Sequence, residues 1–209
     1  MALAWFVTAL DQLLGLGWVR WGVRPREWDG LVGIVVGPLI HGSFTHLLQN
    51  TAPIAVLGTA LVTGYPKARV AALALIYVGS GLAVWCFARP APHVGASGLA
   101  LGMLTFVFLI GVMRRDRPAM ALALIAAFLY GGMIWGIFPS EPGISYEAHG
   151  FGALMGVIAA VWLRGRDPTP PVKRYSWEGE PPSGDSWKPH YGPMNDSPSG
   201  PNSTSRPDE

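Results

Sequence analysis

The sequence is poor in charged residues, and the few it has are unevenly placed. Only 13% of the 209 residues are charged and half are apolar, whereas a soluble domain is about 25% charged. From Gly30 to Arg115 there is no acidic residue. The formal net charge of +2 gives no reason to invoke a nucleic-acid partner. These absences exclude an ordinary soluble domain and indicate an integral membrane protein that sits in a lipid bilayer.

Cysteine and metal-binding motifs are also scarce. Cys86 is the only cysteine, so no internal disulfide can form. The zinc-protease pattern H-E-x-x-H is absent, and the one carboxylate near a histidine in the apolar runs, Glu147, is two residues from His149 and so points to a different helical face. His41 and His46 are five residues apart, which places them on different faces of a helix. We therefore expect no metal site. The N-terminus lacks the basic flank and cleavage site of a signal peptide.

Apolar runs of about 17 to 25 residues, the length that crosses a bilayer, occur six times. They are Ala2–Val19, Phe44–Val62, Ala68–Phe87, Ala96–Met113, Ala119–Phe138 and Ser145–Leu163. We predict an all-α membrane domain of six transmembrane helices over residues 1–164. The first run is the weakest, because it is short and contains Asp11, which would cost about 2.5–3.5 kcal/mol at a helix centre. The alternatives for that run are an interfacial helix or a true start further upstream.

The composition changes after Arg164. The last 45 residues contain ten prolines, five glycines and almost no aliphatic residues. Such a segment cannot bury enough apolar surface to fold. We predict that residues 165–209 form a disordered, proline-rich cytoplasmic tail.

The basic residues predict the orientation of the spans. On one side lie nine: Lys67, Arg69, Arg114, Arg115, Arg117, Arg164, Arg166, Lys173 and Arg174. The opposite loops hold four: Arg20, Arg24, Arg26 and Arg89. The positive-inside rule then places both termini in the cytoplasm. We expect a multi-pass protein of a bacterial plasma membrane.

Four polar residues fall at the same end of three predicted spans. His46 and Asn50 lie near the outer end of the second span, one turn apart on one face. Ser97 opens the fourth span, and His149 lies near the outer end of the sixth. Because these three spans run in the same direction, the four residues share one depth. Polar groups are costly inside a membrane and are usually functional, and these residue types are the components of acyl transfer.

Glycines around Ser97 favour a nucleophile over an ordinary helix-capping serine. Gly95 and Gly98 remove side chains near the hydroxyl and permit unusual backbone angles. Gly98 also begins a G-x-x-x-G pattern, and a second pattern begins at Gly152; small residues four apart let helices pack closely in lipid. We predict a Ser97–His149 dyad without an acidic third member.

The remaining polar residues near the site allow more than one interpretation. His46 and Asn50 could donate to a developing oxyanion together with the Ser97 backbone N–H, or could only bridge two helices. His41 could support the site or lie in a loop that faces water. His93, just before the glycine motif, is predicted to be a loop residue.

With these motifs the sequence resembles the rhomboid family of intramembrane serine proteases. The resemblance runs from Ala2 to Arg164 and rests on HGSFTHLLQN (41–50), GASG (95–98) and HGFG (149–152). It implies a six-helix bundle that cleaves transmembrane segments of other proteins without a cofactor. It also implies Ser97 as nucleophile, His149 as general base, and His46 with Asn50 in the oxyanion hole. Three family features differ: the first loop lacks a Trp-Arg pair, the second span lacks a glutamate, and Leu101 replaces an aromatic residue found in some members.

Two other functions compete with proteolysis. One is a catalytically silent rhomboid-like protein that binds membrane clients; the intact Ser97, His149 and Asn50 argue against it. The other is a small transporter, which would favour internal repeats or interrupted helices; we find no repeat in the sequence.

Overall fold

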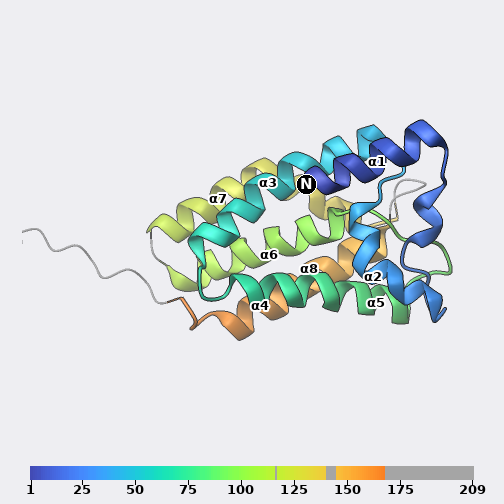
Figure 1. Cartoon of the computed structure of the whole chain (residues 1–209). Helices are drawn as coiled ribbons and strands as arrows, with labels where there is room; N and C mark the ends of the chain where they lie inside the picture. Colours follow the sequence, from blue (N-terminus) through green and yellow to red (C-terminus); the bar gives the residue numbers. More distant parts are fainter. Residues whose placement is uncertain (116, 140–144, 168–209) are drawn as a thin grey trace, which may run out of the picture. The chain divides into compact units, whose positions relative to one another are not determined.

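The computed structural model describes residues 1–115, 117–139 and 145–167, and in these ranges the chain is helical without named strands. The longer helices are α1 (Ala2–Leu14), α3 (Phe44–Gly64), α4 (Arg69–Ala74), α5 (Ser80–Phe87), α6 (Ser97–Arg114), α7 (Arg117–Tyr130) and α8 (Tyr146–Leu163) (Figure 1). A π-helical turn, Leu75–Gly79, joins α4 to α5, and a 3₁₀ segment, Gly131–Ile137, continues α7. The predicted all-α class is confirmed. The tail was predicted at residues 165–209, and residues 168–209 lie outside the described residues.

Five helical segments are long and apolar enough to cross a membrane. They are Phe44–Gly64, Arg69–Phe87, Ser97–Arg114, Arg117–Ile137 and Tyr146–Leu163. These correspond to the second through sixth predicted spans. Their exposed residues include many large apolar side chains, among them Phe128, Leu124 and Trp162, as expected for surfaces that face lipid.

The first predicted span, Ala2–Val19, is wrong in length. Helix α1 has 13 residues and ends at Gly15, which adopts the left-handed conformation with φ 63°. A helix of that length spans about 20 Å, less than the roughly 30 Å hydrocarbon core of a bilayer. Asp11 is buried near the end of this helix and accepts a hydrogen bond from the Trp18 backbone N–H at 2.9 Å. The carboxylate therefore closes a turn and does not occupy the centre of a span.

Helix α1 packs beside α3 in the antiparallel direction. The Trp5 indole N–H donates to Thr51 Oγ1 at 3.1 Å, and the Gln12 side chain donates to the Gly42 carbonyl at 3.3 Å. The later residue of α1 thus meets the earlier residue of the α3 segment. This pairing places the end of α1 near the end of α3 that carries His46.

Helix α6 is the centre of the bundle and contacts α3, α7 and α8, most extensively α8. Two glycine pairs allow this contact. A Cβ added at Gly102 would lie 2.8 Å from the Gly152 carbonyl oxygen, and one added at Gly152 would overlap the Gly98 carbonyl. The predicted G-x-x-x-G contact between these two helices is therefore present. Around it lies the largest apolar core, which includes Leu57, Leu61, Tyr65, Ile76, Leu101, Phe106, Ile110 and Leu163.

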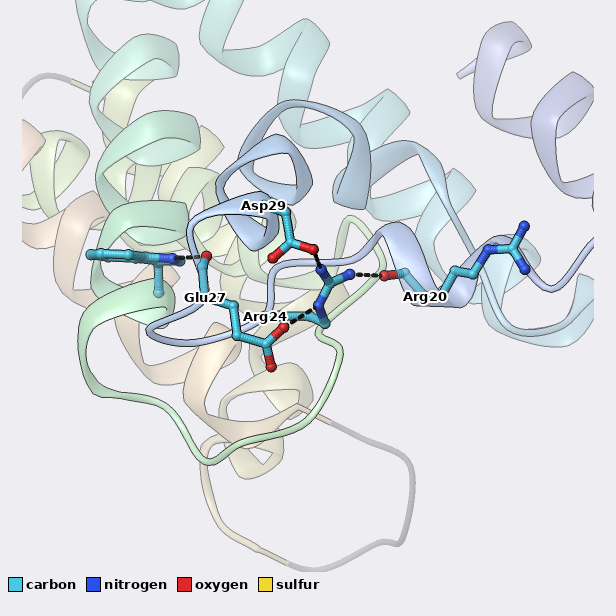
Figure 2. Close-up of polar contacts among 5 residues, drawn as sticks. Arg20, Arg24, Glu27 and Asp29 are labelled. Carbon is cyan, nitrogen blue, oxygen red and sulfur yellow. Dashed lines mark hydrogen bonds and ion pairs between the residues drawn. The ribbon is translucent and has the colours of Figure 1, made fainter.

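The segment between α1 and α3 is folded into short helical pieces. They are Trp18–Trp21, Asp29–Leu31, Val32–Val36 (α2) and Gly37–Leu39. The Arg24 side chain links three residues of this segment. It donates to the Glu27 carboxylate at 2.6 Å, to the Arg20 carbonyl at 2.6 Å and to the Asp29 carboxylate (Figure 2). The Trp85 indole N–H at the end of α5 donates to the Glu27 carbonyl at 2.8 Å, which fixes this segment to the third span.

At the end of the bundle away from His46, the Asp167 side chain joins the end of α8 to the start of α4. Its buried carboxylate accepts hydrogen bonds from the backbone N–H groups of Lys67 at 2.9 Å and Ala68 at 3.0 Å. These N–H groups precede α4, so Asp167 acts as an N-terminal cap supplied by a distant part of the chain. The folded domain therefore continues to at least Asp167, three residues beyond the expected boundary.

Candidate active site

His46 and Asn50 are placed by the start of α3. The Ser43 hydroxyl accepts a hydrogen bond from the His46 backbone N–H at 3.1 Å and caps the helix. His46 is half-buried, whereas Asn50 is only 3% exposed. The Asn50 Nδ2 group has no hydrogen-bond partner among the described protein groups. Asn50 is thus a buried amide whose donor is free.

His41 lies directly before α3 and is completely buried, so it does not face water. Its ring packs edge-on against the His46 ring, with centroids 5.0 Å apart. Neither ring nitrogen has a partner within the described part of the chain. Burial, with a smaller contribution from the charge of His46, lowers the pKa of His41 to about 4. Of the two roles considered for His41, support of the site fits this position.

The backbone before Ser97 packs directly against His46. Gly95 has φ 102°, and a Cβ added there would lie 2.6 Å from His46 Cε1 and 2.9 Å from Nε2. Only glycine meets both the backbone angle and the close approach. The Gly95 N–H also donates to the Gly37 carbonyl at 2.9 Å. Ser97 follows as the first residue of α6 and is half-buried.

His149 is placed by the start of α8. Its side chain is buried and packs against Gly136, where an added Cβ would overlap Nδ1. A Cβ at Gly98 would lie 2.6 Å from the Ala148 carbonyl oxygen. The residue after Ser97 therefore contacts the residue before His149.

No hydrogen bond joins Ser97 to His149 within the described residues, and His149 Nδ1 has no partner there. Catalytic hydrogen bonds of this kind often form only when substrate is bound. The geometry brings the starts of α3, α6 and α8 together at one end of the bundle, where the sequence predicted His46, Asn50, Ser97 and His149.

Glu147 is directed away from His149. Its carboxylate lies 3.6 Å from the Arg89 side chain and accepts from the Arg89 backbone N–H at 3.4 Å. Glu147 is therefore engaged elsewhere and does not orient His149. Across residues 1–115, 117–139 and 145–167, no group of three or more His, Cys, Asp or Glu residues could hold a metal ion.

Two residues beside the site were not predicted to take part in it. His93 lies in a loop, as expected, but it is buried and its Nδ1 is 2.6 Å from the Ser145 hydroxyl. Ser145 caps α8 by accepting from the Ala148 backbone N–H at 3.1 Å. A serine three residues before the first apolar turn could have indicated the cap. Nothing in the sequence indicated its contact with His93, which is 52 residues away.

Comparison with known proteins identifies the class. A family model described as "Rhomboid domain" matches residues 29–166. The chain belongs to the rhomboid family, and the resemblance predicted from its motifs is confirmed. Rhomboid proteins are in general serine intramembrane proteases, and the five apolar helices together with this domain define an integral membrane protein.

Particular relatives come from mycobacteria. An uncharacterized protein of Mycobacterium tuberculosis is 36% identical over 172 residues, covering 78% of this chain and 72% of the relative. A protein of Mycobacterium bovis matches with the same values. One from Mycobacterium leprae is 32% identical and covers 78% of this chain and 68% of the relative. No solved structure matches the chain.

Proposed function

We propose that this protein is an intramembrane serine endopeptidase that cleaves transmembrane segments of other membrane proteins, with a Ser97–His149 dyad. The observation that carries the proposal is the backbone packing around Ser97. Gly95 lies against the His46 ring on one side, and Gly98 lies against Ala148 on the other. These contacts support the proposal, because they hold the starts of α3, α6 and α8 together at one end of the bundle.

The reaction follows the serine protease pattern. His149 accepts the proton of the Ser97 hydroxyl as Oγ forms a bond to the carbonyl carbon of the scissile peptide. The tetrahedral intermediate then collapses, the C–N bond breaks, and His149 donates its proton to the leaving amine. Water, deprotonated by His149, attacks the acyl-enzyme ester and releases the second product and Ser97. The chemistry requires no cofactor.

The Asn50 amide supports an oxyanion hole. The intermediate carries negative charge on the former carbonyl oxygen and needs donors aimed at that position. A buried amide without a partner costs about 1–3 kcal/mol of stability, and a cost of that size fits a donor reserved for a bound group. We assign Asn50 Nδ2, the His46 ring and the Ser97 backbone N–H to this role. His41 and Gly95 support it by packing against His46.

We further propose that the protein resides in a bacterial plasma membrane with both termini in the cytoplasm, so that the site opens near the outer leaflet. The support is the nine-to-four asymmetry of basic residues between the two sides. Cysteine labelling of a Cys86→Ser protein tests it. A cysteine placed in the tail should react with a membrane-impermeant reagent only after cell lysis. Strong labelling in intact cells would show that the tail lies outside and that the proposed orientation is wrong.

Active-site labelling tests the proposed reaction. A fluorophosphonate probe should label the wild-type protein and not Ser97→Ala. Ser97→Ala and His149→Ala should each abolish cleavage of a single-span substrate while the melting temperature in detergent stays within a few degrees. Wild-type protein that is folded but is neither labelled nor active would instead indicate a silent rhomboid-like protein that binds membrane clients. Near-native cleavage by either variant would refute the dyad.

A further inference from the structure

His93 connects three separate parts of the chain from a buried position in the loop between α5 and α6. Its backbone N–H and carbonyl pair with those of Val23, both at 2.9 Å. Its ring Nδ1 lies 2.6 Å from Ser145 Oγ, and Nε2 lies 3.1 Å from the Arg89 carbonyl oxygen. The ring thus joins the loop that leads into Ser97 to the cap of the helix that carries His149.

The partners of His93 determine its tautomer. A carbonyl oxygen can only accept, so the bond to Arg89 requires the proton on Nε2. In the neutral ring, Nδ1 is then an acceptor, and the Ser145 hydroxyl donates to it. Ser145 Oγ in turn accepts from the Ala148 backbone N–H at 3.1 Å. Burial lowers the pKa of His93, which favours this neutral form at physiological pH.

The result is a fully satisfied chain of hydrogen bonds from the loop into the first turn of α8. It ends at Ala148, whose carbonyl packs against Gly98 and which directly precedes His149. A second connection runs in parallel with it. Arg89 lies 3.6 Å from Glu147, and its guanidinium lies 4.7 Å from the centre of the Tyr146 ring. Both connections join the segment before Ser97 to the segment before His149.

We propose that His93 and Ser145 form a positioning clamp that fixes the start of α8 against the start of α6 and so holds His149 in register with Ser97. The clamp rests on the proposed protease function and extends it. Neither residue is a catalytic residue; both act through the backbone segments that they join. A displacement of about 1 Å between reacting groups can cost on the order of 10²-fold in rate, so a contact of this kind affects turnover as well as stability.

Two substitutions of His93 separate its two hydrogen bonds. Asparagine can place its carbonyl oxygen where Nδ1 lies and so keep the bond from Ser145. Glutamine can place its amide nitrogen where Nε2 lies and so keep the bond to the Arg89 carbonyl. That bond joins two residues of the same loop and does not reach α8. We expect His93→Gln to lower kcat by roughly 10- to 100-fold with little change in KM. We expect His93→Asn to keep kcat within about threefold of wild type.

Asp167→Asn is the matched control. Asp167 is also a buried cap between distant segments, but α8 continues for 14 residues after His149, about 21 Å, before the turn that carries Asp167. It should lower the melting temperature and leave kcat unchanged. If both His93 variants lower the melting temperature and keep wild-type kcat, as this control does, His93 is only a structural cap and the clamp is refuted.

The same samples separate failure of the clamp from failure of the protease assignment. If the wild type cleaves substrate and reacts with fluorophosphonate while His93→Gln keeps its turnover, only the clamp is wrong. If folded wild-type protein does neither, both proposals fall. Equal loss of kcat in His93→Asn and His93→Gln would also overturn the clamp, because keeping the bond to Ser145 would then give no advantage in turnover.

Discussion

Replacing Asn50 with alanine is the sharpest single test of the proposed chemistry. If the Asn50 amide donates to the oxyanion, the contact exists mainly in the transition state. Loss of one such donor costs about 2.7–4 kcal/mol of transition-state stabilisation, or 10²–10³ in kcat. The substrate ground state does not use this contact, so KM should change little.

The structure also gives the effect of the same change on stability. In the described part of the chain the Asn50 Nδ2 group has no partner, so alanine removes a burial penalty of about 1–3 kcal/mol. The space left by the amide costs on the order of 1 kcal/mol. These terms offset one another. We therefore expect a melting temperature that is unchanged or slightly raised, although the rate falls by two to three orders of magnitude.

The assay is turnover of a single-span substrate in liposomes, with kcat and KM determined separately. The melting temperature is measured on the same purified sample. Gln49→Ala is the control, because it deletes an amide from the neighbouring, exposed position of α3. A kcat for Asn50→Ala within about threefold of wild type, together with a clearly lower melting temperature, would show that Asn50 only bridges helices.

Three further predictions concern packing, the tail and protonation. Gly152→Ala would bring a Cβ into the Gly98 backbone, so we expect a loss of about 1–3 kcal/mol, measured as a lower melting temperature; Gly150→Ala, which meets nothing within 4 Å, should be harmless, and equal effects would refute the close contact. Deleting the residues after Asp167 should leave the turnover of membrane-purified protein largely intact; a large loss at normal yield would assign the tail a role. Because burial lowers the pKa of His41 from 6.5 to about 4, the unfolded chain binds more protons between these values. The melting temperature should therefore fall as the pH is lowered through this window, and His41→Phe should reduce the slope; an unchanged slope would remove His41 as the cause.

The later spans could be predicted closely because length and hydropathy dominate their sequence. The second span was expected at Phe44–Val62 and forms Phe44–Gly64, and the sixth was expected at Ser145–Leu163 and forms Tyr146–Leu163. In both, a serine before the first helical residue marks the start. Few other conformations satisfy the backbone of such a segment in lipid.

The first span and the loop after it were harder to predict because local backbone signals compete there with hydropathy. Gly15 and Gly17 both adopt positive φ. Helix α1 therefore ends at Leu14, five residues before Val19, where the apolar run ends. The fold of the following segment depends on Arg24, whose partners lie three to five residues away, and on Trp85 of the third span, whose indole donates to the Glu27 carbonyl. Apolar run length carries no information about either feature.

The candidate site could be predicted at the level of depth but not of contact. Direction and spacing place Ser97 and His149 at one level, because alternate spans run the same way. The link between His93 and Ser145 depends on how two loops pack, and no periodicity encodes a contact between residues 52 positions apart. Glu147 illustrates the same limit: spacing alone shows that it points to a different face from His149, whereas its partner, Arg89, is visible only in the fold.

Unsatisfied polar atoms are concentrated where the chemistry is proposed. His41, Asn50 and His149 all have buried nitrogen atoms without a partner among the described protein groups, and all three lie at the end of the bundle where Ser97 begins α6. Each such atom opposes folding by about 1–3 kcal/mol. The larger apolar core lies further along the same helices, around Leu61, Phe106 and Leu163, and its packing offsets that cost. Lipid provides no hydrophobic force between helices, so close van der Waals contact along the glycine seam must hold them together. The seam that stabilises α6 against α8 therefore also sets the spacing of Ser97 and His149, and loosening it should reduce stability and turnover together.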